Sequence, residues 1–197
     1  MLFGRKFRSG PLTKVAAKTA AEVCRHFPLG KDAGKLLQED LTPSQFLDLL
    51  VEKKLYLDAL RFLAHALPKA EAVRWACLCT RSVLGPQPEA PSAAALQAAE
   101  QWVAEPSEEN RRAAQATAAA AGYDTPAGCA AMAAFWSGGS LGPPNTPVIP
   151  PGEYLTSHGA WGAVLLAALV PDPGKTEKKH YQFLSQGIEL ANHSSGK

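Results

Sequence analysis

The near absence of β-strand signals is the feature that most constrains the fold of this sequence. Alternating runs of Val, Ile, Thr and aromatic residues never exceed a few positions, while alanine, leucine, glutamate and lysine predominate. Threonine followed by proline, a typical helix start, occurs at Thr42-Pro43 and again at Thr125-Pro126. We therefore predict an all-α fold, an irregular bundle of about nine or ten helices arranged as successive helical hairpins.

Proline, glycine and capping residues divide the chain into segments with helical periodicity. Ser92 and Ser107 are expected to cap two of the helices. The tryptophans at positions 75, 102, 136 and 161 show no fixed spacing, so an irregular bundle fits the sequence better than a regular α-solenoid. The predicted helices cover residues 12–25, 31–38, 43–52, 55–67, 71–84, 92–104, 108–121, 126–136, 156–170 and 177–191.

Length and composition indicate one globular domain. The chain has 197 residues, of which 46% are hydrophobic and 19% charged, and this is enough apolar material for one core. We expect a flexible basic tail over residues 1–11, a single helical domain over 12–191 and a disordered tail over 192–197.

Charge is balanced overall but not at the amino-terminal end. The net charge of +2 gives no reason to expect sequence-specific binding of nucleic acid. Arg5, Lys6 and Arg8, however, lie among aliphatic and aromatic residues in the first eight positions. This basic tail is either a solvated terminus or an element that docks on an acidic partner, a phosphate or a membrane surface.

A long stretch rich in proline and glycine lies between the predicted helices 126–136 and 156–170. Residues 138–152 contain five prolines and four glycines, which exclude a helix or a central strand. Loops of this length are uncommon in compact domains, and they either carry function or wrap the surface. We therefore expect a surface loop over these residues.

Catalytic and metal-binding motifs are missing from the sequence. The five histidines are scattered, and none has the spacing of a zinc site or of an activated nucleophile. His65 precedes a helix end, where an imidazolium would interact favourably with the helix dipole. The four cysteines are expected to be buried and reduced. We therefore expect no catalytic residues, no metal and no cofactor.

Hydropathy favours a cytoplasmic location. No secretory signal follows Met1, because Arg5-Lys6 interrupt the first apolar residues. The longest apolar run, residues 160–170, is about half the length that a membrane span needs. We predict a buried helix there and no transmembrane segment.

Two clusters of polar residues are candidates for partner binding. Glu71 and Arg74 can pair beside Trp75, in an arrangement typical either of an interface or of the edge of a core.

The segment Ser137-Gly138-Gly139-Ser140 is a helix stop rather than a phosphate loop, because it follows a helix. Residues 108–112 allow several Glu–Arg pairs, which indicate a solvated helix face.

Three stretches together resemble a family of uncharacterised bacterial helical proteins, loosely associated with type VI secretion gene neighbourhoods. The stretches are residues 58–79, with the sequence DALRFLAHALP and then AVRWACLC, residues 108–112, EENRR, and residues 133–141, AAFWSGGSL. The resemblance implies a bacterial cytoplasmic accessory protein and supplies no catalytic residues. It also adds Trp136, Ser137, Gly138, Gly139 and Ser140 to the partner-binding candidates. These stretches are expected to meet in the fold, with the loop over residues 138–152 crossing the helices that contain Trp75 and Trp136.

Three functions from different classes fit these observations. The first is a non-enzymatic interaction module, an adaptor or chaperone-like accessory that offers a helical surface to a protein partner. The second is a structural subunit of a larger assembly, and a homo-oligomer is compatible with it. The third is an enzyme with an unfamiliar site near His65, Glu71, Arg74 and Ser137.

Overall fold

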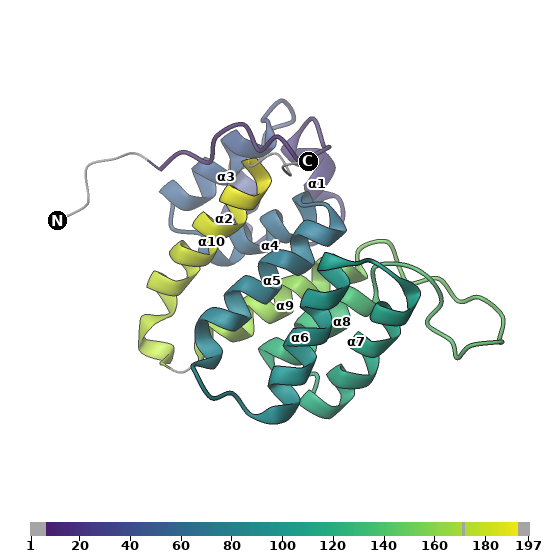
Figure 1. Cartoon of the computed structure of the whole chain (residues 1–197). Coiled ribbons are helices and arrows are strands. Elements are labelled where there is room, and N and C mark those ends of the chain that lie inside the picture. Colours follow the sequence, from purple (N-terminus) through teal and green to yellow (C-terminus); the bar gives the residue numbers. More distant parts are fainter. Residues whose placement is uncertain (1–6, 171, 193–197) are drawn as a thin grey trace.

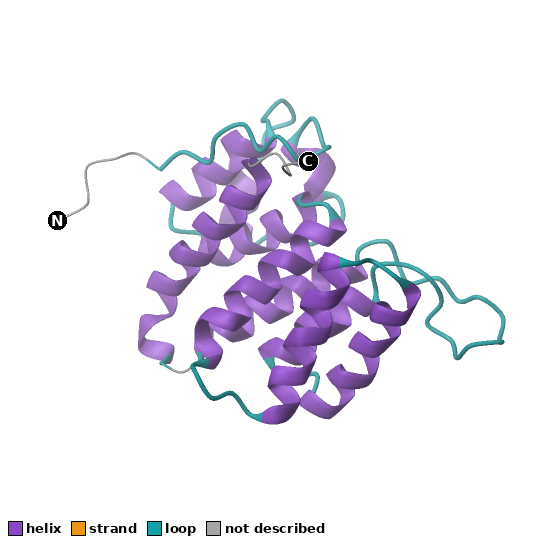
Figure 2. Ribbon diagram, viewed as in Figure 1, coloured by secondary structure: helices purple, strands orange, loops and turns teal. Residues whose placement is uncertain are grey.

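A computed structural model describes the protein over residues 7–170 and 172–192. Within these residues the chain forms ten α-helices and one 3₁₀ turn and no β-strand, which confirms the predicted all-α fold (Figure 1; Figure 2). The elements are α1 (Ala20–Cys24), α2 (Lys31–Leu36), α3 (Pro43–Glu52), α4 (Tyr56–Ala66), α5 (Lys69–Leu84), α6 (Ala90–Ala104), α7 (Glu108–Ala121), α8 (Pro126–Phe135), α9 (Leu155–Leu169), η1 (Pro173–Lys175) and α10 (Thr176–Asn192).

Helices α4, α5 and α9 form the centre of the bundle (Figure 1). Helix α5 packs against α6, α8, α9 and α10, while α9 packs against α4, α5 and α8. Helices α6, α7 and α8 pack on one another on one side, and α1, α2, α3 and α10 gather around α4 at the other end. The alanine-rich faces allow close packing: a Cβ at Gly159 of α9 would lie 3.0 Å from the Cα of Ala133 in α8.

Trp75 of α5 lies in the core and not on a binding surface. Its side chain is 0% exposed, and its indole N–H donates a hydrogen bond of 2.8 Å to the carbonyl of Phe183 in α10. Gly187 of α10 packs on the same ring, because a Cβ there would come within 2.9 Å of the indole. The helix that covers Trp75 is thus α10, and the indole is not available to a partner in this structure.

The prediction of a first helix over residues 12–25 is wrong in most of its length. Only Ala20–Cys24 is helical, and Leu12 has a positive φ of 48°. The N–H of Leu12 donates to the side chain of Asn192 at 2.8 Å, and that of Lys14 donates to the carbonyl of Ala191 at 2.9 Å. These contacts and the positive φ of Leu12 hold residues 12–14 in a non-helical conformation against the end of α10.

The described part of the expected basic tail lies against the domain. The N–H of the buried Ser9 donates to the carboxylate of Asp48 at 2.7 Å, and Arg8 lies 3.6 Å from the same carboxylate. Phe7 meets Tyr181 of α10 edge to face, with the ring centroids 5.5 Å apart. Arg5 and Lys6 lie outside the described residues, as do residues 193–197 of the expected carboxyl-terminal tail.

Of the four residues predicted to cap a helix, three do so in the structure and Ser92 does not. The side chain of Thr42 forms a capping box with Gln45, and Ser107 and Thr125 accept the N–H groups of residues 110 and 128. Ser92 was expected to cap α6, but this helix begins at Ala90 with Pro91 in its first turn. The fixed φ of proline favours that position, and it moves the start two residues earlier.

Candidate functional site

The segment rich in proline and glycine forms a loop that projects from the bundle between α8 and α9 (Figure 1). Every residue from 143 to 150 is exposed. At the tip, Val148 is 75% exposed and Ile149 55% exposed, although both are large apolar side chains. The expectation that this loop crosses the Trp75 helix is therefore wrong, and a protruding apolar tip takes its place.

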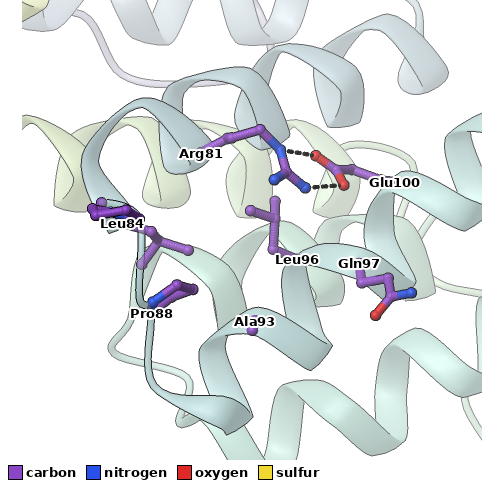
Figure 3. A pocket seen from close by; sticks show the side chains of 9 residues that line it. Arg81, Leu84, Pro88, Ala93, Leu96, Gln97 and Glu100 are labelled. Atoms are coloured by element: carbon purple, nitrogen blue, oxygen red, sulfur yellow. Dashed lines mark hydrogen bonds and ion pairs between the residues drawn. The ribbon is translucent and has the colours of Figure 1, made fainter.

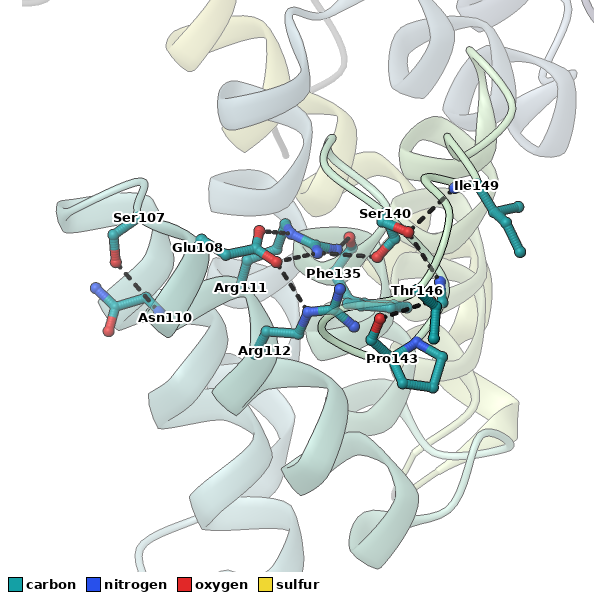
Figure 4. Close-up of polar contacts among 11 residues, drawn as sticks. Ser107, Glu108, Asn110, Arg111, Arg112, Phe135, Ser140, Pro143, Thr146 and Ile149 are labelled. Carbon is teal, nitrogen blue, oxygen red and sulfur yellow. Dashed lines mark hydrogen bonds and ion pairs between the residues drawn. The ribbon is translucent and has the colours of Figure 1, made fainter.

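Arg111 of α7 anchors the base of this loop (Figure 4). Its side chain is only 4% exposed. The guanidinium donates to the carbonyl of Phe135 at 2.7 Å and to that of Ser140 at 3.0 Å, and it makes two further hydrogen bonds, of 2.6 and 2.7 Å, to the carboxylate of Glu108. It also lies 4.6 Å from the ring centroid of Phe135. The contacts with Phe135 and Ser140 hold the end of α8 and the start of the loop against α7, while the bonds to Glu108 fix the guanidinium on α7 itself.

The local sequence of α7 explains how Arg111 reaches this position. Capping by Ser107 starts the helix so that Glu108 lies one turn before both arginines, and Arg112 also donates to its carboxylate at 2.8 Å. The hydrogen bond from Arg111, supported by Arg112, lowers the pKa of Glu108 to about 2. The predicted Glu–Arg pairs are therefore present, but the prediction of a solvated helix face is wrong at Arg111, which is buried.

Glycine and serine shape the loop where it leaves α8. Gly139 has a φ of +65°, and a Cβ there would lie 2.8 Å from the Arg111 guanidinium. The hydroxyl of Ser140 accepts the N–H groups of Gly142 and Ile149, both at 3.1 Å, while the N–H of Leu141 donates to the carbonyl of Ile149 at 2.8 Å. These bonds tie the two arms of the loop together below its tip (Figure 4).

The remaining partner-binding candidates of this stretch, Trp136, Ser137 and Gly138, lie at the end of α8 and the start of the loop. Trp136 is the half-buried C-cap of α8. The carbonyl of Ser137 accepts a hydrogen bond of 3.1 Å from Lys69, the first residue of α5. Gly138 is half-buried and has open space around its Cα. The structure therefore brings the stretch 133–141 together with the stretch 108–112 and with the start of α5.

Glu71 and Arg74 form a separate cluster. The expected pair is present, with the Arg74 Nε 3.5 Å from a Glu71 oxygen. Glu71 is only 12% exposed, however, and its other oxygen accepts a hydrogen bond of 3.0 Å from Lys14. Lys14 could not be found from sequence, because it lies 57 positions away in a segment that was expected to be helical. Of the two cations, Lys14 is the one that fixes the amino-terminal segment to α5, since Arg74 lies on the same helix as Glu71.

A cavity of about 320 Å³ lies beside His65, one of the four residues of the enzyme hypothesis. His26, Tyr154 and Lys14 also line it, whereas Glu71, Arg74 and Ser137 do not. The hydroxyl of Tyr154 is hydrogen-bonded to the Nε2 of His26 at 2.8 Å. The arrangement does not bring the four residues of the enzyme hypothesis into one cavity.

His65 itself is a neutral, buried imidazole. Its Nδ1–H donates to the carbonyl of Arg61 at 2.8 Å, so its Nε2 carries the lone pair, and this atom has no hydrogen-bond partner in the described structure. Burial lowers the pKa of His65 to about 4. The expectation of an imidazolium at the end of the helix is therefore wrong.

The cysteines do not supply a nucleophile or a metal site. All four are free; Cys77 and Cys79 are buried as expected, while Cys24 and Cys129 are half-buried. Burial raises the pKa of Cys24 and of Cys77 to about 12, so these thiols stay protonated at neutral pH. No group of three or more His, Cys, Asp or Glu side chains within residues 7–170 and 172–192 could hold a metal ion.

A second cavity, of about 590 Å³, lies between the end of α5 and α6 (Figure 3). Its only charged lining residues are Arg81 and Glu100, which pair with each other through two hydrogen bonds, one of them 2.7 Å long. Leu84, Leu96 and proline rings form much of the remaining wall. Because its two charges neutralise each other, the cavity offers no free charge to a ligand.

Comparison with known proteins assigns a family but no activity. The sequence model of DUF6931, a family of unknown function, matches residues 46–191, so the chain belongs to this family. No curated protein and no solved structure matches the chain. None of the helices in the described ranges is long and apolar enough to span a bilayer.

Proposed function

We propose that this member of the DUF6931 family is a non-enzymatic protein-interaction module, and that it binds its partner through the tip of the proline-rich loop, residues 143–151. The observation that carries the proposal is the contrast between the two ends of this loop. The base is fixed by a buried arginine, whereas the tip exposes Val148 and Ile149 to solvent. A loop with no binding role has no need of such a combination.

The energetics favour this use of the loop. Burying the exposed part of the Val148 side chain in a partner would contribute up to about 1.5–3 kcal/mol. The hydrogen bonds at Ser140 and Leu141 hold the two arms together before binding, so less conformational entropy is lost when the partner docks. An anchored loop therefore binds more tightly than a flexible linker of the same composition.

The wider setting follows from the resemblance of the sequence to bacterial helical proteins. We propose a cytoplasmic adaptor or chaperone-like accessory of a bacterial multiprotein system, with type VI secretion as the first system to examine. The loop serves equally as the contact of a structural subunit, because a protruding apolar tip fits a neighbouring chain in an assembly. The enzyme hypothesis has less support, since its four residues do not share a cavity.

Substitution of the tip tests the proposal. A partner that co-purifies with the native chain is expected to be lost from the double variant Val148→Asp/Ile149→Asp. The control is Leu57→Asp, which places one negative charge on an apolar side chain of α4 that is 53% exposed. If the tip variant and the control recover the same proteins as the native chain, the loop is not the binding element.

A further inference from the structure

We infer that residues 146–151 are a polyproline II ligand, which docks in a groove of the partner protein lined by aromatic side chains. This inference rests on the proposed function of the loop and adds the chemistry of the partner. It is argued from the backbone of the segment, from the sides that it presents and from its lack of charge.

The sequence restricts the backbone of this segment to an extended form. Pro147, Pro150 and Pro151 have their φ fixed near −65° by the pyrrolidine ring, and the residue before each proline is restricted to extended conformations. Only Val148 is free of both restrictions. The segment forms no helix or strand in the structure. These restrictions favour polyproline II, whose ordering on binding requires little further loss of entropy.

The contacts of Ile149 decide which side of the segment faces the partner. Its N–H and carbonyl are hydrogen-bonded to Ser140 and Leu141, and its side chain lies against Gly142. A polyproline II helix has three residues per turn, so Pro147 and Pro150 lie on one edge that differs from the edge of Ile149. Both prolines are exposed. The segment therefore presents a proline-x-x-proline edge to solvent.

The composition of the loop excludes the other common kinds of partner. Residues 138–152 contain no charged side chain, so they offer nothing to a phosphate, a nucleic acid or a strongly charged protein surface. Five of the nine residues from 143 to 151 are prolines without an N–H group, so the loop cannot complete the edge of a β-sheet. An apolar groove whose aromatic rings pack on proline is the remaining fit.

Photo-crosslinking from the full chain identifies the partner surface. Benzoylphenylalanine is placed at Val148, with Tyr123 as a control position that is 61% exposed in the turn after α7. We expect capture from position 148 alone, and crosslinks on a partner surface that contains Trp, Tyr or Phe. Capture from neither position, or equally from both, overturns the proposed function.

Titration of the captured and purified partner then tests its chemistry. The double variant Pro147→Ala/Pro150→Ala is expected to raise the Kd about tenfold, because it loses both preorganisation and ring contacts. The matched control, Pro86→Ala/Pro88→Ala in the connection between α5 and α6, is expected to leave the Kd within about twofold of the native value.

The outcomes separate the two proposals. If Val148→Asp abolishes binding but the Pro147→Ala/Pro150→Ala variant binds as the native chain does, the loop is the binding element and the polyproline II inference is wrong. If neither change affects the Kd, the proposed function is wrong as well. Circular dichroism of each variant confirms that the helical bundle is intact.

Discussion

Substitution of Arg111 should both destabilise the bundle and release the loop. We choose Arg111→Met, because methionine keeps most of the buried aliphatic volume and removes only the guanidinium. The carbonyls of Phe135 and Ser140 then lose the hydrogen bonds that they accept at 2.7 and 3.0 Å. A buried carbonyl without a partner costs about 1–3 kcal/mol. The carbonyl of Ser140 is only partly buried and adds less than that of Phe135, so for the two together we expect a loss of about 3 kcal/mol in the free energy of unfolding.

The control is Arg112→Met on the same helix. Arg112 shares the Glu108 carboxylate with Arg111, but its side chain is 22% exposed and Glu108 is 59% exposed. An ion pair of this kind contributes about 0.5 kcal/mol. The comparison therefore isolates the two backbone carbonyls, since both substitutions remove one arginine that pairs with Glu108.

Urea unfolding followed by circular dichroism measures the stability, and hydrogen exchange measures the loop. The amides of Leu141 and Ile149 should lose protection in Arg111→Met and keep it in Arg112→Met, because both of their hydrogen bonds join the anchored base to the other arm of the loop. Equal losses of stability in the two variants, or unchanged protection of both amides in Arg111→Met, would refute the argument that the buried guanidinium holds the loop.

Two further predictions concern the core. Gly187→Ala should lower the free energy of unfolding by about 3 kcal/mol, because its Cβ would lie 2.6 Å from Leu63 and 2.9 Å from Trp75. The control Gly34→Ala meets no atom within 4 Å and should stabilise the exposed helix by about 0.5 kcal/mol. Urea unfolding measures both variants, and an unchanged stability of Gly187→Ala would contradict the packing. His65 has a folded pKa of about 4, below its value of 6.5 in the unfolded chain, so the unfolded state binds more protons between these values. Stability should fall by about 2 kcal/mol, after allowance for solvent screening, as the pH drops from 6.5 to about 4, and His65→Phe should remove this part of the pH dependence.

Features that depend on neighbouring residues could be predicted from the sequence. The starts at Thr42, Ser107 and Thr125 need only a hydroxyl and the N–H two or three positions later, so the local sequence determines them. The extent of the first helix could not be predicted in this way. Its residues have adequate helix propensity, but their donors pair with residues about 180 positions later, and tertiary contacts override propensity.

The burial of Arg111 also depends on distant residues, although one local signal was present. Arg111 is in helical register with Ala114 and Ala118, and these three residues form the buried face of α7. An arginine on a face of small residues indicates that the guanidinium has buried acceptors. The acceptors themselves, the carbonyls of Phe135 and Ser140, lie 24 and 29 positions later and could be placed only by the fold.

The pairing of the amino-terminal segment with the end of α10 sets the order in which the chain can fold. Asn192 accepts from the N–H of Leu12 and donates to the carbonyl of Ser9, so these contacts form only after the last turn of α10 has been synthesised. Closing a contact between such distant residues is slow compared with forming the helices between them. On the ribosome, the contacts of this segment with α3 and α5 can therefore form before its contacts with α10, which close the bundle last.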